Sequence, residues 1–371
     1  MTRTFNSFLA SALLVLLGGL TTGCGSESQS DTNWTIHEGD LTLDRSLLVS
    51  ETDSFYFGNI VDVAVDSDGH TYVLDWDATH IKVIGPEGGL RDSLGGKGQG
   101  PGEFQGPREV VVGRGDSLYV LDPRSSHISV FSPAGRFARH VQVEYQGIAE
   151  NLMVLDDPSG FLLSNTSFPP PDSPEGGSFS LYRVSPEGSI TDTLLTASPF
   201  QTETIQQGER RLFLGVPFGR QPHVALGPQD RIHAGRNDSL RITSHSLDGS
   251  PAAPTRLPFE SVSISDEERK ERLDQFPDEH RSQIRDAVPA TKPAFDHFLV
   301  DDEARYWFGR PTANSDSTAW WIVMPNKKAV VTETLSSDVA ILTVKNGRAY
   351  GRTTTEMGAP ALVRYQIHSS E

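Results

Sequence analysis

Residues 60–84 read IVDVAVDSDGHTYVLDWDATHIKVI, and residues 107–131 read PREVVVGRGDSLYVLDPRSSHISVF. The two stretches align without a gap at an offset of 47 residues, so that Tyr-Val-Leu-Asp at 72–75 matches the same four residues at 119–122. Apolar residues recur with a period of two, which is typical of β-strands, and Asp-Ser-Asp-Gly at 66–69 is typical of a tight turn. Each copy is therefore expected to form short antiparallel strands joined by turns.

Weaker copies of this pattern continue along the chain, at 151–163 with 179–192, at 222–249, at 295–308 with 320–324, and at 339–365. Four antiparallel strands in about 40–50 residues are the size of one blade of a β-propeller. We therefore predict an all-β fold, a six-bladed β-propeller over residues 35–371. The last copy shows only three strands, so we expect residues 35–50 to supply its outer strand and close the ring.

One segment, residues 266–288, interrupts the strand pattern between the fourth and fifth copies. It is rich in Glu, Arg, Asp and Gln, and Ser265 followed by Glu268 forms a capping-box signature. Pro277 is expected to divide the segment into two short helices. We predict a helical insert that covers one face or the rim of the ring, with a partner-binding helix as the alternative.

The N-terminal residues are predicted to lie outside the fold. Arg3 precedes an apolar run at 8–20, which is too short to span a bilayer comfortably. Cys24, the only cysteine in the chain, follows a small residue just after this run. The arrangement resembles the bacterial lipobox, whose cysteine is lipidated and becomes the new N-terminus, while ordinary signal cleavage beside an incidental cysteine is the alternative. We predict a lipoprotein signal peptide at 1–23 and a flexible tether at 24–34.

A family resemblance starts at residues 95–107, GGKGQGPGEFQGP, which look like the inter-blade segment of NHL-type propellers. With the following strand–turn–strand unit, the helical insert and the terminal stretch 351–358, the chain is similar to six-bladed propeller lipoproteins of NHL or TolB-like type. The resemblance implies an exported protein held on a bacterial membrane by lipidated Cys24. Gly25 lacks the aspartate that marks inner-membrane retention, so the outer membrane or the cell surface is the favoured location.

Composition and motifs exclude several functions. The net charge of −17 argues against nucleic-acid binding, which needs a basic surface. The glycine-rich run around Lys97 lacks the spacing of a phosphate-binding loop, and neither a G-x-S-x-G elbow nor an H-E-x-x-H pair occurs. Trp307, Trp320 and Trp321 are expected to pack in the core. We expect a monomer.

The inner strand of each blade lines the central channel, and aligning the copies on these strands identifies candidate site residues. One aligned position holds Asp62, Glu109, His223 and His297, with Leu152 in the third blade and Ala340 in the sixth. Imidazole and carboxylate together suit Zn²⁺ or a similar divalent cation, so these four residues are a candidate metal site. They could equally ring the mouth in solvent or pack between the blades.

A shift of one residue in strand register changes the candidate set. It brings Arg108, Asn151 and Asp296 into the channel, which predicts a polar ligand pocket in place of a metal site. The favoured function is a ligand- or protein-binding module at the cell envelope, whose partner is a small molecule or an envelope protein. The alternative is a metal-dependent hydrolase or lyase with its site in the channel.

Overall fold

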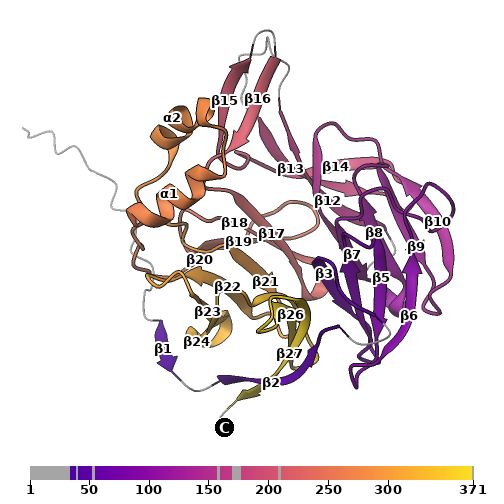
Figure 1. Ribbon diagram of the computed structural model, residues 1–371. Coiled ribbons are helices and arrows are strands. Elements are labelled where there is room, and N and C mark those ends of the chain that lie inside the picture. The colour runs from indigo at the N-terminus through magenta and orange to yellow at the C-terminus, as the bar shows by residue number, and fades with distance from the viewer. Residues whose placement is uncertain are drawn as a thin grey trace, which may run out of the picture. The chain divides into compact units, whose positions relative to one another are not determined.

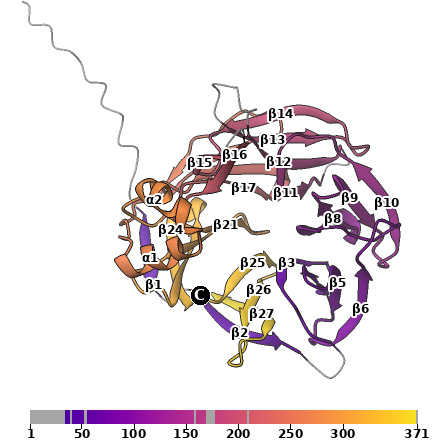
Figure 2. The ribbon, with the colours of Figure 1, turned by 45° about the horizontal axis from the view of Figure 1, so that its top comes forward.

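The computed structural model describes residues 34–38, 41–51, 55–156, 159–168, 177–207 and 210–369, which lie within one compact unit, Asn33–Glu371. The predicted signal peptide, Cys24 and the tether up to residue 33 lie outside the described residues. Six β-sheets of the unit are arranged in a ring (Figures 1 and 2), which confirms the predicted six-bladed β-propeller.

The first three blades are consecutive four-stranded antiparallel sheets. Blade one comprises β3 (Ile60–Val65), β4 (Thr71–Asp75), β5 (His80–Ile84) and β6 (Leu90–Gly95). Blade two comprises β7 (Glu109–Val112), β8 (Leu118–Asp122), β9 (His127–Phe131) and β10 (Phe137–Gln142). Blade three comprises β11 (Ile148–Val154), β12 (Phe161–Ser167), β13 (Ser178–Val184) and β14 (Ile190–Ala197).

Of the last three blades, blades five and six each include one strand from the start of the chain. Blade four comprises β17 (Pro222–Gly227), β18 (Arg231–Arg236), β19 (Arg241–His245) and β20 (Thr255–Arg256). Blade five comprises β21 (His297–Val300), β22 (Tyr306–Pro311), β23 (Ser317–Met324), β24 (Ala329–Ser336) and β1 (Thr35–Glu38). Blade six comprises β25 (Ala340–Lys345), β26 (Arg348–Thr354), β27 (Pro360–Ser369) and β2 (Leu41–Val49). Single 3-10 turns occur at η1 (Arg114–Asp116), η2 (Pro228–Asp230) and η3 (Pro325–Lys327).

The aspartate that ends each Tyr-Val-Leu-Asp repeat holds the segment leading into its blade. The Asp75 carboxylate accepts hydrogen bonds from the backbone N–H groups of Gly58 and Asn59. At the equivalent place in blade two, the Asp122 carboxylate accepts them from Gln105 and Gly106. Both aspartates are almost fully buried, so these bonds satisfy charges that would otherwise be costly to bury. The shared place of the aspartate in the two repeats therefore fixes the backbone segment that connects each blade to the one before it.

The ring is closed as the sequence predicted. β2 pairs antiparallel with β27 as the outer strand of blade six, and Leu41 of this strand is buried in a cluster that contains Trp307 and Trp320. A second closure was not foreseen: β1 pairs in parallel with β24, at the outer edge of blade five. The N-terminal segment thus joins two neighbouring blades and covers both of their outer edges.

The helical insert has the predicted form, with α1 (Asp266–Asp274) and α2 (Asp278–Ala287) separated at Pro277. Ser265 and Glu268 form the expected capping box. The insert packs on a hairpin that the repeat pattern did not reveal, β15 (Thr202–Gln207) with β16 (Arg210–Gly215). Their shared hydrophobic cluster contains Val216, Ile264, Leu273, Ile284 and Val288.

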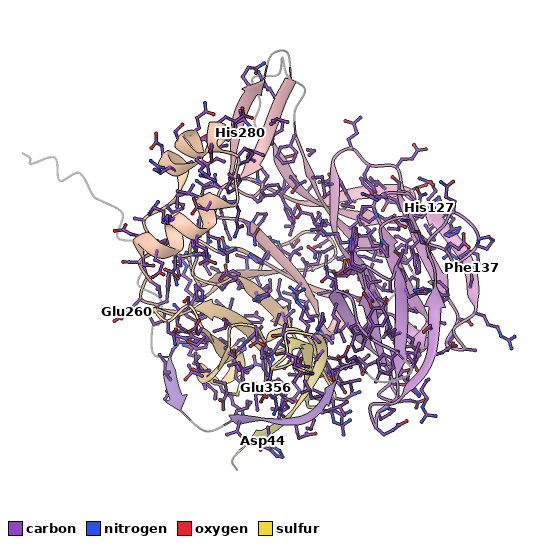
Figure 3. All side chains as sticks on the ribbon, viewed as in Figure 1. Asp44, His127, Phe137, Glu260, His280 and Glu356 are labelled. Carbon is purple, nitrogen blue, oxygen red and sulfur yellow. The ribbon has the colours of Figure 1, made fainter. Side chains whose placement is uncertain are left out.

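Apolar side chains fill the contacts between blades. Trp307 and Trp320 have no exposed surface, which confirms their predicted place in the core. The periphery carries smaller aromatic contacts, such as His127 stacked on His140 with ring centres 4.9 Å apart. Figure 3 places His127 and Phe137 at the outside of blade two. Among the residues that the structure describes, no helix is long and apolar enough to cross a membrane.

Candidate functional site

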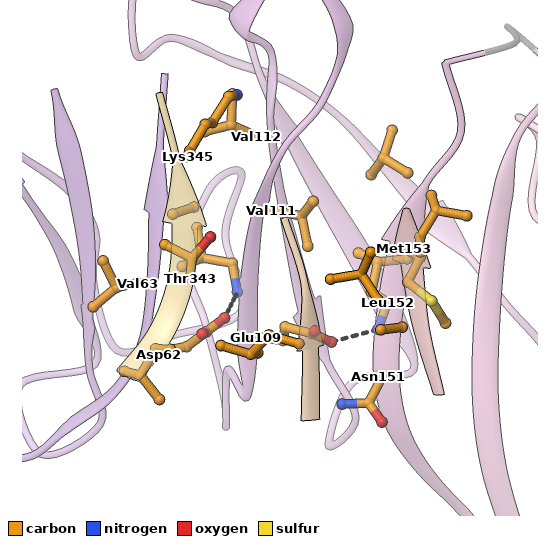
Figure 4. A pocket seen from close by; sticks show the side chains of 18 of the residues that line it. Asp62, Val63, Glu109, Val111, Val112, Asn151, Leu152, Met153, Thr343 and Lys345 are labelled. Carbon is orange, nitrogen blue, oxygen red and sulfur yellow. Dashed lines mark hydrogen bonds between the residues drawn. The ribbon is translucent and has the colours of Figure 1, made fainter. Parts of the chain in front are cut away.

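The inner strands of the six blades surround a central channel. They line a cavity of about 330 Å³, to which β3, β7, β11, β17, β21 and β25 all contribute residues. Figure 4 shows Asp62, Glu109 and Asn151 near one end of this cavity and Lys345 toward the other. Valine and leucine side chains line much of the wall between these ends. The carboxyl and amide groups of this cavity are therefore gathered where the inner strands begin, and Lys345 lies at the opposite end.

Two carboxylates link neighbouring inner strands. Asp62 accepts a hydrogen bond of 2.8 Å from the backbone N–H of Val110 in blade two. Glu109 accepts one from the backbone N–H of Leu152 in blade three (Figure 4). The relation is the same in both cases, because each carboxylate bonds to the residue that follows the equivalent position in the next blade. Asn151, which precedes Leu152, is therefore the blade-three equivalent of Glu109.

The predicted alignment of the inner strands was wrong in two blades. In blade three a β-bulge just before Asn151 shifts the register by one residue, so Asn151 and not Leu152 occupies the aligned position. In blade six a bulge lies between Ile341 and Thr343, and Leu342 and Thr343 line the cavity while Ala340 does not. A bulge adds a residue to one strand only, and the spacing of apolar residues does not reveal it.

The two carboxyl groups have raised pKa values. Burial in the channel raises the pKa of Asp62 from 3.8 to about 7, although its hydrogen bond with Val110 opposes the shift. Burial also raises the pKa of Glu109 well above its usual range, and the nearby charge of Asp62 raises it further. Neighbouring carboxyls in a poorly solvated site cannot both ionise easily. At neutral pH the pair therefore tends to retain a proton, which one carboxyl can donate in a hydrogen bond.

A second cavity, of about 440 Å³, forms the mouth of the channel. Its lining residues are Arg108, Glu150, Asn151, Phe200, Gln221, Pro222, His223, Val224 and Phe298. Asn151, Val224 and Phe298 also line the channel cavity, so the two spaces are continuous. Arg108 and Asn151 are exposed, while Glu150, Gln221 and His223 are half-buried. The mouth is thus open to solvent and rich in polar side chains.

Hydrogen bonds hold the amide side chains of the mouth in one orientation. The Ser164 hydroxyl accepts from the backbone N–H of Asn151 and donates to Asn151 Oδ1. This leaves the two N–H groups of Asn151 Nδ2 for a ligand, since no described residue accepts from them. Gln221 Nε2 lies 3.3 Å from His223 Nε2. An amide nitrogen only donates, so His223 Nε2 is the acceptor and its ring proton lies on Nδ1.

A third cavity, of about 370 Å³, lies between the helical insert and blade five. Asp296 and His297 line it together with Phe218, Arg272 and Lys292. The insert therefore covers part of the rim, as predicted. Burial raises the pKa of Asp296 to about 6, while Arg272 and Lys292 act in the opposite direction. The Asp296 carboxyl opens onto the cavity, whose walls restrict its solvation, and it has no hydrogen bond to another side chain within the described residues.

The two channel histidines are neutral at pH 7. Burial lowers the pKa of His223 from 6.5 to about 4, and His297 nearby adds to the effect. Burial likewise lowers the pKa of His297. Each ring contacts an aromatic side chain: the His223 ring centre is 4.8 Å from that of Phe295, and His297 stacks on Trp320 at 5.8 Å. Packing of this kind reduces access to water and disfavours the imidazolium form.

The four predicted metal ligands fall into two pairs. Asp62 and Glu109 belong to adjacent blades one and two, and His223 and His297 belong to adjacent blades four and five. In the part of the chain that the structure describes, no group of three or more His, Cys, Asp or Glu side chains is arranged to hold a metal ion. The divalent-metal site thus stays a prediction, while all seven candidate channel residues line one of the three cavities.

Several lining residues escaped the sequence analysis. Glu150 is the bulged residue of β11, and Phe200 and Phe218 belong to the loops beside the unpredicted hairpin. Phe200 is held by an edge contact with Phe168, with ring centres 5.6 Å apart. No repeated motif marks these positions. Residues 169–176, which follow Phe168 in a proline-rich stretch, lie outside the described residues.

Comparisons with known proteins identify relatives by structure only. No protein-family model and no curated protein sequence matches the chain. A protein from Bacteroides fragilis described only as exported matches with a TM-score of 0.56 and 12% identity, over 91% of this chain and 100% of that one. A member of the DUF4221 family from Bacteroides vulgatus matches with a TM-score of 0.51 and 8% identity, over 92% and 100% of the two chains.

A gluconolactonase from Xanthomonas campestris also matches, with a TM-score of 0.48 and 12% identity, over 83% of this chain and 85% of that one. At identities this low, the first two matches support the fold alone and transfer no activity. In those two cases the likeness extends over nearly the whole chain. The propeller is therefore a shared architecture, and function has to be argued from the channel and its mouth.

Proposed function

We propose that the chain is a lipid-anchored β-propeller of the bacterial cell envelope that binds a ligand at the mouth of its central channel. The observation that carries this proposal is the mouth itself, where Asn151 and Gln221 are held in fixed orientations beside exposed Arg108. Its volume of about 440 Å³ is within the range of about 300–1,000 Å³ that is usual for ligand pockets. Pre-oriented polar groups reduce the entropy that binding costs.

The export and anchoring parts of the proposal rest on the N-terminal sequence. An apolar run at 8–20 followed by Cys24 supports a lipoprotein signal peptide, and Gly25 supports passage to the outer membrane or the cell surface. The glycine-rich connector at 95–107 and the Tyr-Val-Leu-Asp repeat support a propeller of NHL or TolB-like type. We assign the chain as a monomer.

Mass spectrometry of the chain purified from bacterial membranes tests the anchor. We expect a mature N-terminus at Cys24 that carries a diacylglyceryl group, and we expect Cys24→Ser to leave the chain unlipidated. Ser26→Ala is the matched control, because it alters a small residue of the predicted tether and leaves the thiol intact. A mature N-terminus elsewhere, with Cys24 unmodified, would contradict the proposal.

The same preparation tests the binding site against the metal-dependent alternative. Metal analysis and native mass spectrometry of the purified protein report bound ions and bound small molecules together. A co-purifying organic ligand that is lost in Asn151→Ala supports a binding module. Stoichiometric metal that is lost in both His223→Ala and His297→Ala would favour a hydrolase or lyase instead, with the metal polarising a substrate or activating water.

A further inference from the structure

Polar groups of the mouth are complementary to hydroxyl groups. Arg108 and the free Nδ2 of Asn151 present donors, and the Glu150 carboxyl and Gln221 Oε1 present acceptors. A hydroxyl group donates one hydrogen bond and can accept others. Neighbouring hydroxyl groups of one ligand can therefore accept from the guanidinium and amide N–H groups and donate to the carboxyl and amide oxygens. The fixed orientation of Asn151, set by Ser164, gives this arrangement a defined geometry.

The charges at the mouth compensate one another locally. Arg108 interacts electrostatically with Glu109 and with Glu150. In the same way Asp296, which lines the third cavity, interacts with Arg272, Lys292 and Arg220. The mouth itself is lined by one arginine and one carboxyl group, so it does not present charges of one sign only. A ligand with a large net charge would therefore meet like charges wherever it bound, which favours an uncharged polar ligand.

Aromatic side chains border the polar groups. Phe200 is half-buried and lines the same cavity as Asn151 and Gln221. Phe298 lines that cavity too, although most of its ring is buried. An aromatic ring offers an apolar face to the C–H groups of a ligand whose other edges are polar. The mouth combines this face with oriented donors and acceptors.

We infer that the mouth of the channel binds a neutral saccharide, whose hydroxyl groups bond to Arg108, Asn151 and Gln221 and whose C–H face packs on Phe200. The inference rests on the proposed function, because it names the ligand class of the same site. A peptide is the less favoured ligand, since its side chains need apolar subsites and the lining of the mouth is mainly polar.

The test uses the full-length protein, purified in a detergent without a sugar headgroup. It is applied to immobilised panels of neutral oligosaccharides, sulfated oligosaccharides and short peptides with free termini, and each hit is titrated by calorimetry. We expect binding to neutral oligosaccharides only. Arg108→Ala and Asn151→Ala are each expected to weaken binding by about tenfold or more, as the loss of a hydrogen bond to an oriented group predicts.

Arg241→Ala is the matched control, because Arg241 is an exposed arginine of blade four that lines none of the three cavities. Its binding and melting temperature should equal those of the unchanged protein, and the melting temperatures of the mouth variants show whether they are folded. Absence of binding to every neutral oligosaccharide overturns the inference. Binding of a peptide that is lost in Asn151→Ala overturns it while supporting the proposed function, and binding that neither mouth variant weakens contradicts both.

Discussion

The Asp62 carboxylate accepts a hydrogen bond of 2.8 Å from the backbone N–H of Val110, and so joins the inner strand of blade one to that of blade two. Glu109 forms the same link to Leu152 in blade three. An acidic side chain at the start of an inner strand thus joins two neighbouring blades by a hydrogen bond, and it also lines the channel. A substitution of Asp62 by asparagine separates these two roles, because it removes the charge and keeps an oxygen that can accept the hydrogen bond from Val110.

Asp62→Asn is expected to change how stability depends on pH. The folded protein retains the Asp62 proton up to a pKa of about 7, whereas the unfolded chain releases it near 3.8. The free energy of unfolding therefore falls as pH rises between these values and is level above them. Asp62→Asn retains an acceptor for the Val110 N–H and removes this loss of stability, so we expect the variant to be more stable than the unchanged protein at pH 7, by up to about 4 kcal/mol for a difference of about three pKa units.

Chemical denaturation across the same pH range measures the effect. Asp68→Asn is the control, because Asp68 lies on an exposed turn of the same blade. Equal pH profiles for Asp62→Asn and the unchanged protein would show that the Asp62 carboxyl ionises as easily in the folded state as in the unfolded chain.

His223 is expected to remain neutral in weakly acidic solution. Its pKa is lowered from 6.5 to about 4, so the unfolded chain binds a proton in this interval that the folded protein does not. Stability contributed by the neutral ring is complete above 6.5 and is lost as pH falls toward 4. Nitrogen-detected NMR of labelled histidine should show one tautomer, protonated at Nδ1, still present at about pH 5.5. The urea-unfolded chain is the reference, and a folded-state midpoint equal to the reference would refute the prediction.

Ring closure by β2 is expected to be a major source of stability. Leu41 is 3% exposed and packs in a cluster with Trp307 and Trp320. Leu41→Ala removes buried methyl groups and leaves a cavity, so we expect it to lower the free energy of unfolding by about 2–5 kcal/mol. Ile36→Ala in β1 is the control, since Ile36 is 51% exposed, and it should change stability by about 0.5 kcal/mol or less. Equal effects of the two substitutions in denaturant titrations would be evidence against the closure.

Glu268 is expected to stabilise the helical insert through Lys292. Lys292 is 6% exposed, and its ammonium group contacts the Glu268 carboxylate and the carbonyl oxygen of Thr312. Glu268→Ala leaves this buried charge without its carboxylate, which typically costs about 3–5 kcal/mol, and it also removes the capping box at Ser265. Hydrogen exchange within 266–287 should rise strongly. Glu267→Ala, an exposed change in the same helical turn, should leave exchange close to normal, and a similar rise in both variants would disprove a specific role for the pair.

Much of the candidate site was predictable because inner strands repeat. Asp62 and Glu109 stand at the same place in two copies that align without a gap, so their common position on the channel wall followed from the alignment. Asn151 was considered only as a one-residue shift, because the bulge that selects it has no apolar signature. Phe200 and Glu150 were missed, since the first lies in a loop and the second is the bulged residue itself.

The sequence by itself determined the blades, their turns, the capping box at Ser265 and the closing strand near Leu41, because each depends on local periodicity or on a residue type that suits one backbone conformation. Tertiary structure alone decided which groups meet at the mouth. It paired Asp62 with a backbone N–H of the next blade, and it separated the two carboxyls from the two imidazoles. Such contacts join residues far apart in the chain, and their distances depend on bulges and on the curvature of the ring rather than on any local pattern.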